Sequence, residues 1–237
     1  MNKAKRYVVF LVGLFVNSLG VSVITKADLG TSPISSIPYV LSLNYSLSLG
    51  TFTMLFSLLL VFLQLLILRK NFKLEIPISI LFGWFIDLTM AMMDGLVMEQ
   101  YVVKFLFLLL GCVILGVGVY TEVAADVAML PGESFVRAVS TTWKKEFGAT
   151  KVCFDVSMTV IAGALSLYYT HRLEGVREGT IVAALLVGFI ARLIGRRAPF
   201  LKRFLEDGSA ASAQQEVTPE ARTAWVISIG RQYGSGG

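Results

Sequence analysis

Six apolar stretches, each long enough to cross a lipid bilayer, limit what this chain can fold into more than any other feature of its sequence. A spanning helix needs about 20 consecutive, mostly apolar residues. The stretches cover about residues 7–25, 50–69, 77–96, 102–121, 150–171 and 179–196. Only 16% of the residues are charged and 55% are hydrophobic, whereas soluble domains carry about 25% charged residues. The sequence therefore predicts an all-α integral membrane protein with six transmembrane helices.

Lysine and arginine lie mainly in alternate connecting segments, and this bias predicts the orientation in the membrane. If the N-terminus is cytoplasmic, the cytoplasmic segments hold thirteen of these residues and the opposite side holds four. Both termini are therefore expected in the cytoplasm. Most of the net charge of +5 then comes from these lysine and arginine residues, which lie next to anionic lipid headgroups and set the orientation. The lipid bilayer is the expected partner, and no nucleic acid is needed to explain the charge.

Residues 26–48 and 122–148 are too polar to be spans, and they belong to an internal repeat. When the chain is shifted by 98 residues against itself, ten identities align over residues 13–56. Several are glycine, proline or aspartate, the residues that set backbone shape: glycine permits conformations that other residues avoid, and proline fixes φ. The aligned pairs are Gly13/Gly111, Gly20/Gly118, Val21/Val119, Ala27/Ala125, Asp28/Asp126, Pro33/Pro131, Ser36/Ser134, Ser42/Ser140, Gly50/Gly148 and Phe56/Phe154.

The third and sixth spans also match, after a seven-residue insertion in the second copy. Repeat 1 thus covers about residues 7–96 and repeat 2 about 102–197, each with three spans and one short interrupted element. Because three is odd, the second copy enters the membrane upside down relative to the first. Inverted repeats with broken elements in corresponding places are typical of transporters. A duplication without a transport role is the alternative.

Each interrupted element is expected to hold a short amphipathic helix, at about residues 36–46 and 134–146, because apolar residues recur there every four positions. Ser36 and Ser134 precede these apolar faces and are the expected N-caps. Pro38 then falls in the first turn, where its missing N–H costs little. We expect the two short helices at opposite faces of the membrane.

Polar groups around the two interruptions form the candidate binding site. Irregular backbone at membrane depth must line water or be covered by protein, so we expect the two interruptions to approach one cavity from opposite sides. The candidate substrate-binding residues are Asp28, Thr31, Ser32, Ser35, Ser36, Asp126, Glu133 and Ser134. The helix N-termini favour an anionic group on the solute, and the two aspartates favour a proton or cation. Surface loops with ordinary capping residues are the alternative.

Charged residues inside the spans need partners, since a charge at mid-membrane costs about 2.5–3.5 kcal/mol on insertion scales. Asp87 and Arg192 occupy corresponding positions in the third and sixth spans. We expect them to pair at the repeat interface, as a structural ion pair or as a gate. Asp155 is expected to pair locally with Lys151, four residues earlier.

The sequence offers no catalytic constellation. Cys112 and Cys153 lie in apolar stretches and are interpreted as structural thiols, while the single histidine, His171, belongs to neither a triad nor a metal-ligand pattern. We therefore expect no catalytic residue, no metal and no cofactor. An intramembrane enzyme is disfavoured for the same reason.

Two blocks of sequence carry a family resemblance. GTSPISSIPY at residues 30–39 and GVREGTI at residues 175–181 resemble the YitT/YczE-type bacterial membrane proteins, over about residues 5–200. The resemblance implies a multi-pass protein of the bacterial plasma membrane. Transport is the usual suggestion for such proteins, and no catalytic residue can be carried over.

The C-terminal segment has a different character from the membrane domain at 1–205. Residues 206–224 are small and polar, as expected of a cytoplasmic linker. Residues 225–237 begin with the strand-like WVISI and continue into GRQYGSGG, the order in which a phosphate-binding loop begins. They resemble the truncated start of a cytidylate-kinase-like domain, although Gly237 stands where such a loop has lysine. The phosphate-binding candidates are Gly230, Gly234, Ser235 and Gly236. A flexible glycine tail is the alternative.

Two functions follow from these observations. The leading one is a six-span transporter or permease of the inverted-repeat type for a small polar or anionic solute. The second is a membrane anchor or sensor for the C-terminal domain. A water-filled cavity that reaches Asp28 and Asp126 would favour transport, whereas a closed apolar bundle would favour the anchor. The sequence leaves the oligomeric state open, and a homo-oligomer is compatible with it.

Overall fold

The computed structural model describes residues 3–68 and 75–197, and within this part the chain forms eight helices. The helices are α1 (Lys3–Lys26), α2 (Pro33–Asn44), α3 (Leu49–Leu68), α4 (Glu75–Met92), α5 (Tyr101–Ala125), α6 (Pro131–Thr142), α7 (Phe147–Thr170) and α8 (Glu178–Arg197). Near the end of α8, the side chains of Arg192 and of residues 195–197 lie outside the description. The predicted all-helical fold is confirmed for the described residues.

Five of these helices, α1, α3, α4, α5 and α7, are long and apolar enough to cross a membrane. The described apolar part of α8 covers only Glu178–Ala191, so the sixth span stays a prediction. Large apolar side chains stand on the outer faces of the helices: Phe62 is 56% exposed, Trp84 59% and Leu185 71%. Extensive apolar exposure of this kind marks a surface that contacts something other than water. Lipid is the contact that the helix lengths fit.

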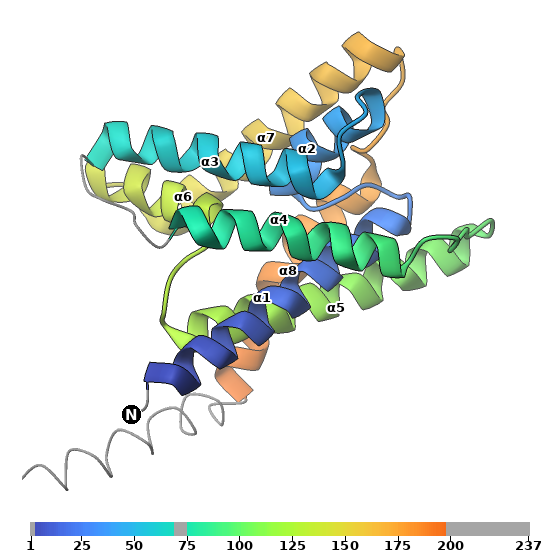
Figure 1. The fold of residues 1–237 in the computed structure, drawn as a ribbon. Coiled ribbons are helices and arrows are strands. Elements are labelled where there is room, and N and C mark those ends of the chain that lie inside the picture. The colour runs from blue at the N-terminus through green and yellow to red at the C-terminus, as the bar shows by residue number, and fades with distance from the viewer. Residues whose placement is uncertain (1–2, 69–74, 198–237) are drawn as a thin grey trace, which may run out of the picture.

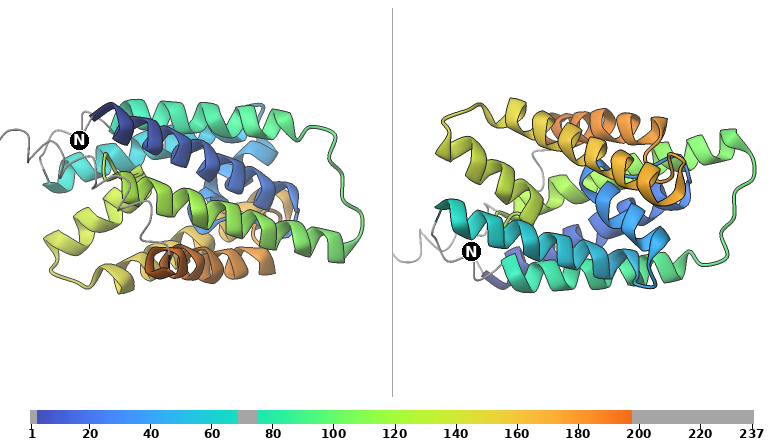
Figure 2. Two further views of the ribbon diagram at one scale, coloured as in Figure 1. Left: turned by 90° about the horizontal axis from the view of Figure 1, so that it is seen from below. Right: turned by 90° about the horizontal axis from the view of Figure 1, so that it is seen from above.

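The helices form two layers (Figures 1 and 2). In the first layer, α1 contacts α4 and α5, and α5 contacts α8, so that the order across the layer is α4–α1–α5–α8. In the second layer, α3 and α7 each contact both short helices, α2 and α6. The largest hydrophobic core lies in the first layer and includes Leu14, Ile24, Ile86 and Leu108, which are fully buried.

Glycines allow α1 and α5 to cross at very short range. A Cβ on Gly20 would lie 2.5 Å from the backbone nitrogen of Leu115, and a Cβ on Gly118 would lie 2.5 Å from that of Asn17. Helices in membranes commonly associate through such small residues, because close backbone approach increases van der Waals contact. The side-by-side course of α1 and α5 is visible in Figure 1.

The two short helices begin earlier than the sequence suggests. Their N-caps are Ser32 and Leu130, and each is followed by proline as the first helical residue. The expected N-caps, Ser36 and Ser134, are therefore wrong. Proline at the first position is pre-organised for a helix, and the residue before it favours the extended backbone that an N-cap needs. Pro38 consequently lies in the interior of α2 rather than in its first turn.

The short helices lie at opposite ends of α3. The ring of Tyr45, just after α2, packs against Phe52 near the start of α3. In contrast, Ser134 of α6 donates a hydrogen bond to Glu75, which follows the end of α3. The expectation that the two short helices lie at opposite faces of the membrane stays a prediction.

Candidate functional site

The two aspartates that follow α1 and α5 form matching ion pairs. Asp28 and Asp126 both have the left-handed backbone conformation that often ends a helix, with φ values of 56° and 49°. Asp28 Oδ2 lies 2.6 Å from Lys104 Nζ, and Asp126 Oδ2 lies 2.5 Å from Arg6 Nη2. Lys104 comes 98 residues after Arg6, so the repeat relates one ion pair to the other.

These ion pairs lie at opposite ends of α5. Lys104 is in its first turn and Asp126 follows its last residue, a separation of about 33 Å at the usual helical rise of about 1.5 Å per residue. The expectation that Asp28 and Asp126 approach one cavity is therefore wrong. The physical reason is that α1 and α5 pack antiparallel, which carries the two helix C-termini to opposite ends of the molecule.

The first interruption, between α1 and α2, is closed by hydrogen bonds. Thr31, Ser32, Ser35 and Ser36 are all buried. The Thr31 amide donates to Thr180 Oγ1 at 3.3 Å, and the Thr25 and Thr31 hydroxyls are 2.9 Å apart. Ser32 Oγ donates to Ser35 Oγ, and Ser36 Oγ donates to the Ser32 carbonyl. This irregular backbone is covered by protein, which is one of the two ways to place it at membrane depth.

A cavity of about 260 Å³ lies between α7 and α8, and we call it the α7–α8 groove. It is lined by Pro33, Val152, Asp155, Val156, Thr159, Val160, Thr180, Ile181, Ala184 and Leu185. Pro33 is the first residue of α2, so the groove reaches the first interruption. Asp155 Oδ1 lies 2.9 Å from Lys151 Nζ, which confirms the expected local pair. The remaining lining is mostly apolar.

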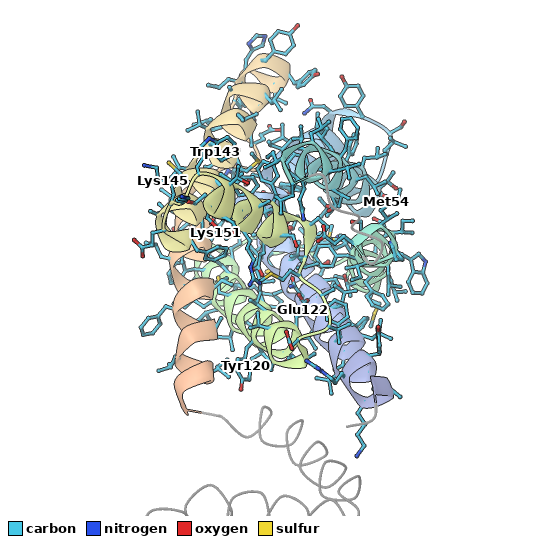
Figure 3. The ribbon with its side chains drawn as sticks, turned by 90° about the vertical axis from the view of Figure 1, so that its left-hand side faces the viewer. Met54, Tyr120, Glu122, Trp143, Lys145 and Lys151 are labelled. Atoms are coloured by element: carbon cyan, nitrogen blue, oxygen red, sulfur yellow. The ribbon has the colours of Figure 1, made fainter. Side chains whose placement is uncertain are left out.

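Glu133, in the first turn of α6, belongs to a charged group at the second interruption. Burial raises the pKa of the Glu133 carboxyl, while the Lys151 ammonium opposes that rise and the Asp155 carboxylate adds to it. Figure 3 shows this end of the molecule, with Lys151 on α7 close to α6 and Glu122 on α5 below them. The groove lining does not include Glu133.

Ser134 lies in a second polar cluster, together with two residues that the sequence did not single out. Ser134 Oγ and Gln64 Nε2 both donate to Glu75 Oε1, at 2.9 and 3.1 Å. Gln64 is only 2% exposed and Glu75 8%. The sequence did contain a signal, since Gln64 is the single polar residue in the apolar run LLLVFLQLLIL.

The crossing of α1 and α5 contains one more buried polar pair. Asn17 Nδ2 donates to Glu122 Oε1 at 2.9 Å, and the two residues are 2% and 5% exposed. The positions that the repeat relates to them are the apolar Leu115 and Ile24. The pair therefore has no polar counterpart in the other half of the crossing.

Asp87 binds the start of α3. Its Oδ1 accepts from the Gly50 amide at 2.8 Å, and its Oδ2 accepts from Ser48 Oγ at 2.6 Å. Asp87 thus caps a helix N-terminus, where a carboxylate is favourable. The Arg192 side chain lies outside the described residues, so the expected Asp87–Arg192 pair stays a prediction.

Two other predictions concern phosphate binding at the C-terminal end of the sequence and metal binding. The phosphate-binding candidates Gly230, Gly234, Ser235 and Gly236, and the linker before them, lie outside the described residues. Within residues 3–68 and 75–197, no group of three or more histidine, cysteine, aspartate or glutamate residues is placed to hold a metal ion. Cys112 is buried and Cys153 is exposed, and both are free thiols.

The fold and its apolar outer surface define a membrane-embedded, multi-pass helical protein. The chain belongs to a family of unknown function, DUF6198, which matches residues 4–196. No curated protein and no solved structure matches it. The resemblances to YitT/YczE-type proteins and to cytidylate kinases stay predictions.

Proposed function

We propose that this protein is a transporter, built from two inverted repeats, that moves a small polar solute across the bacterial plasma membrane with both termini in the cytoplasm. The α7–α8 groove is the access route for the solute in the conformation described above. The observation that carries the proposal is a difference between corresponding helix pairs: α3 and α4 are packed together, whereas α7 and α8 are separated by the groove.

The contacts between α1 and α5 support an inverted repeat. Glycines at corresponding positions face corresponding partners: a Cβ on Gly13 would approach Glu122, and one on Gly111 would approach Ile24. A shift of 98 residues takes Gly13 to Gly111 and Ile24 to Glu122. The Gly20 and Gly118 contacts exchange in the same way, as do the two ion pairs that end these helices. Antiparallel packing of corresponding helices is what a second copy inserted upside down requires.

The second layer follows the same exchange. In repeat 1, α2 packs on α7 of the other repeat, and in repeat 2, α6 packs on α3. The arrangement therefore supports a pseudo-two-fold axis that relates α1 to α5, α2 to α6 and α3 to α7. Transporters of this kind place the solute between the repeats.

The two repeats differ in how their last two helices pack, and this difference supports alternating access. Gly50 of α3 and Gly83 of α4 are in backbone contact, so that a Cβ on either residue would overlap the other helix. Both glycines are retained in repeat 2, as Gly148 and Gly188, yet a Cβ on Gly148 would meet only Glu146 Oε1, at 3.5 Å. If α7 closed on α8 while α3 and α4 separated, the two repeats would exchange conformations. The solute site between the repeats would then open to the other side of the membrane.

Reconstituted vesicles test this proposal. Val156→Cys and Ile181→Cys, introduced together after Cys112 and Cys153 are replaced by alanine, place two thiols on opposite walls of the groove. We expect uptake of at least one compound from a panel of radiolabelled nucleosides, amino acids and carboxylates. A thiol-to-thiol cross-link should block that uptake, and reductant should restore it. Each single-cysteine variant under the same oxidant is the control. Uptake that continues unchanged in the fully cross-linked protein would exclude this groove.

A membrane anchor or sensor is the second candidate, and one observation favours it. The carboxylates of Asp28 and Asp126 form ion pairs with the side chains of Lys104 and Arg6, and neither aspartate lines the α7–α8 groove. If vesicles take up no compound of the panel above the level of empty liposomes, the anchor function replaces the transporter.

A further inference from the structure

In the part of the chain that the structure describes, two buried side-chain oxygen atoms lack a hydrogen-bond partner, and both belong to the cluster between α3, α4 and α6. They are Gln64 Oε1 and Glu75 Oε2. Glu75 Oε1, by contrast, accepts two hydrogen bonds, from Gln64 Nε2 and Ser134 Oγ. Both unpartnered atoms are acceptors. A buried acceptor without a partner costs free energy, so something that supplies positive charge or a donor is missing from this cluster.

The electrostatics of the cluster point to positive charge. Among the described residues, no lysine or arginine forms an ion pair with Glu75. The nearest acid on α6, Glu133, interacts instead with Lys151 and Asp155 of α7. A buried carboxylate that no cationic side chain of the described residues compensates is costly unless it is neutralised. A water molecule could donate to both free oxygens, but it would leave the negative charge uncompensated.

The second repeat has no such acid. The positions that correspond to Gln64, Glu75 and Ser134 are Ala162, Thr180 and Ser36. The Ser36 and Thr180 hydroxyls both have backbone partners, the Ser32 carbonyl and the Thr31 amide, and Ala162 is fully buried among apolar side chains. The unpartnered acceptors are therefore a property of one half of the molecule and not of the repeat.

We infer that Gln64, Glu75 and Ser134 form a binding site for one small monovalent cation, either a proton or Na⁺. A proton on Glu75 Oε2 neutralises the carboxylate and supplies a donor in the cluster that contains Gln64 Oε1. A sodium ion would take the same two oxygens as ligands, since carboxylate and carbonyl oxygens suit hard cations. In a transporter this is the coupling ion, but the binding itself does not depend on transport.

Thermal unfolding of the purified full chain in detergent tests the site without any solute. If the ligand is Na⁺, replacing choline chloride by NaCl at constant ionic strength should raise the Tm of the parent, by roughly 5–10 °C when Na⁺ reaches about 100 times its Kd. Glu75→Gln should abolish this shift. Glu99→Gln, at an exposed loop position, is the matched control and should retain it.

If the ligand is a proton, the Tm of the parent should not depend on Na⁺ but should fall as the pH rises, and this fall should be smaller in E75Q, which keeps the component that Glu133 contributes. The infrared difference spectrum of the parent minus E75Q should then show the carbonyl band of one protonated carboxylic acid, whereas the parent minus E99Q should not. Gln64→Leu retains the carboxylate and removes the free amide oxygen, so it keeps the test decisive if E75Q does not fold. If the ligand is Na⁺, this variant should bind it at least about 10-fold more weakly. If the ligand is a proton, the variant should shift the pH at which the acid band disappears.

The inference is overturned if the parent and E75Q respond alike to Na⁺ and to pH and their infrared spectra show the same acid bands. The cluster then holds water only. Because no uptake is measured, this outcome leaves the transport proposal untouched, and a failure to find transport leaves the cation site untouched.

Discussion

The α3/α4 pair and the α7/α8 pair are built from corresponding parts of the sequence, but they pack differently. Asp87 of α4 accepts hydrogen bonds from Ser48 and Gly50 at the start of α3, which ties the two helices together. The residues that correspond to Asp87 and Ser48 are Arg192 and Glu146. An arginine cannot accept hydrogen bonds from the N-terminal amides of α7, and the positive end of that helix repels it.

The difference teaches that a repeat can retain its packing glycines and lose the polar contact that holds the helices closed. In the second half, closure would instead bring Arg192 towards Glu146, two groups of opposite charge. The first pair is held by a helix cap, and under the proposed transport cycle the second would be held by an ion pair that forms only on closure.

The largest expected effect comes from filling the α3/α4 contact. Gly50→Ala places a methyl group on the Gly83 carbonyl and the Asp87 carboxylate, and we expect a loss of about 1–3 kcal/mol, as for other overpacked contacts. Gly148→Ala, at the corresponding position, has room and should be neutral or stabilising by up to about 1 kcal/mol, because alanine favours a helix over glycine. Chemical denaturation in detergent measures both. Equal losses would contradict the structural difference between the pairs.

A smaller effect is expected from the helix cap. Asp87→Asn keeps the shape of the side chain and one acceptor oxygen but removes its charge, and we expect a loss of about 0.3–1 kcal/mol, typical for a negative charge at a helix N-terminus. Arg192→Gln is the matched change in repeat 2. It should leave stability within about 0.5 kcal/mol and instead reduce uptake, since the proposed ion pair forms only in the closed conformation. An Asp87→Asn variant as stable as the parent would show that the cap does not hold α3 to α4.

The smallest expected effect is on the pH dependence of Tm, through the charged residues near the groove. Glu133, Lys151 and Asp155 correspond to the neutral residues Ser35, Thr53 and Ser57 of repeat 1. Burial raises the pKa of Glu133 above its ordinary value of 4.5, so the folded state binds a proton more tightly than the unfolded chain. The stabilisation by this proton is present below the ordinary pKa and is lost as the pH rises through the folded-state value.

Glu133→Gln should remove this component of the pH dependence of Tm, while Ser35→Ala, at the corresponding position, should leave it in place. The measurement is the Tm from about pH 4 to pH 7 at constant Na⁺. An E133Q profile with the slope of the parent would mean that Glu133 titrates alike in the folded and unfolded chain.

Much of the helical layout could be predicted from the sequence, because apolar length determines where a helix can cross a bilayer. The predicted span at 50–69 is α3 at Leu49–Leu68, and that at 150–171 is α7 at Phe147–Thr170. The short helices were found, but their starts were missed. Proline as the first helical residue, at Pro33 and Pro131, marks the helix starts better than the serines three residues later.

The site was predicted less well. The sequence marked Asp28 and Asp126 as cavity residues, but the antiparallel crossing of α1 and α5 makes them helix-end ion pairs. It did not mark Gln64 or Glu75 at all, because Gln64 is a single polar residue within an apolar run and Glu75 stands just before the next predicted span. What isolates them from water is α6, which arrives from more than 50 residues away in the chain.

The sequence by itself thus determined which segments are helical and that five of them are long and apolar enough to cross a bilayer, since these depend on local composition and spacing. Only the tertiary structure decided which polar groups meet. Hydrogen bonds and ion pairs act over a few ångströms, so a residue's partner depends on how distant helices cross. The glycine contacts show this clearly: a Cβ on Gly50 would overlap Gly83 of α4, whereas a Cβ on the corresponding Gly148 would meet only Glu146 Oε1.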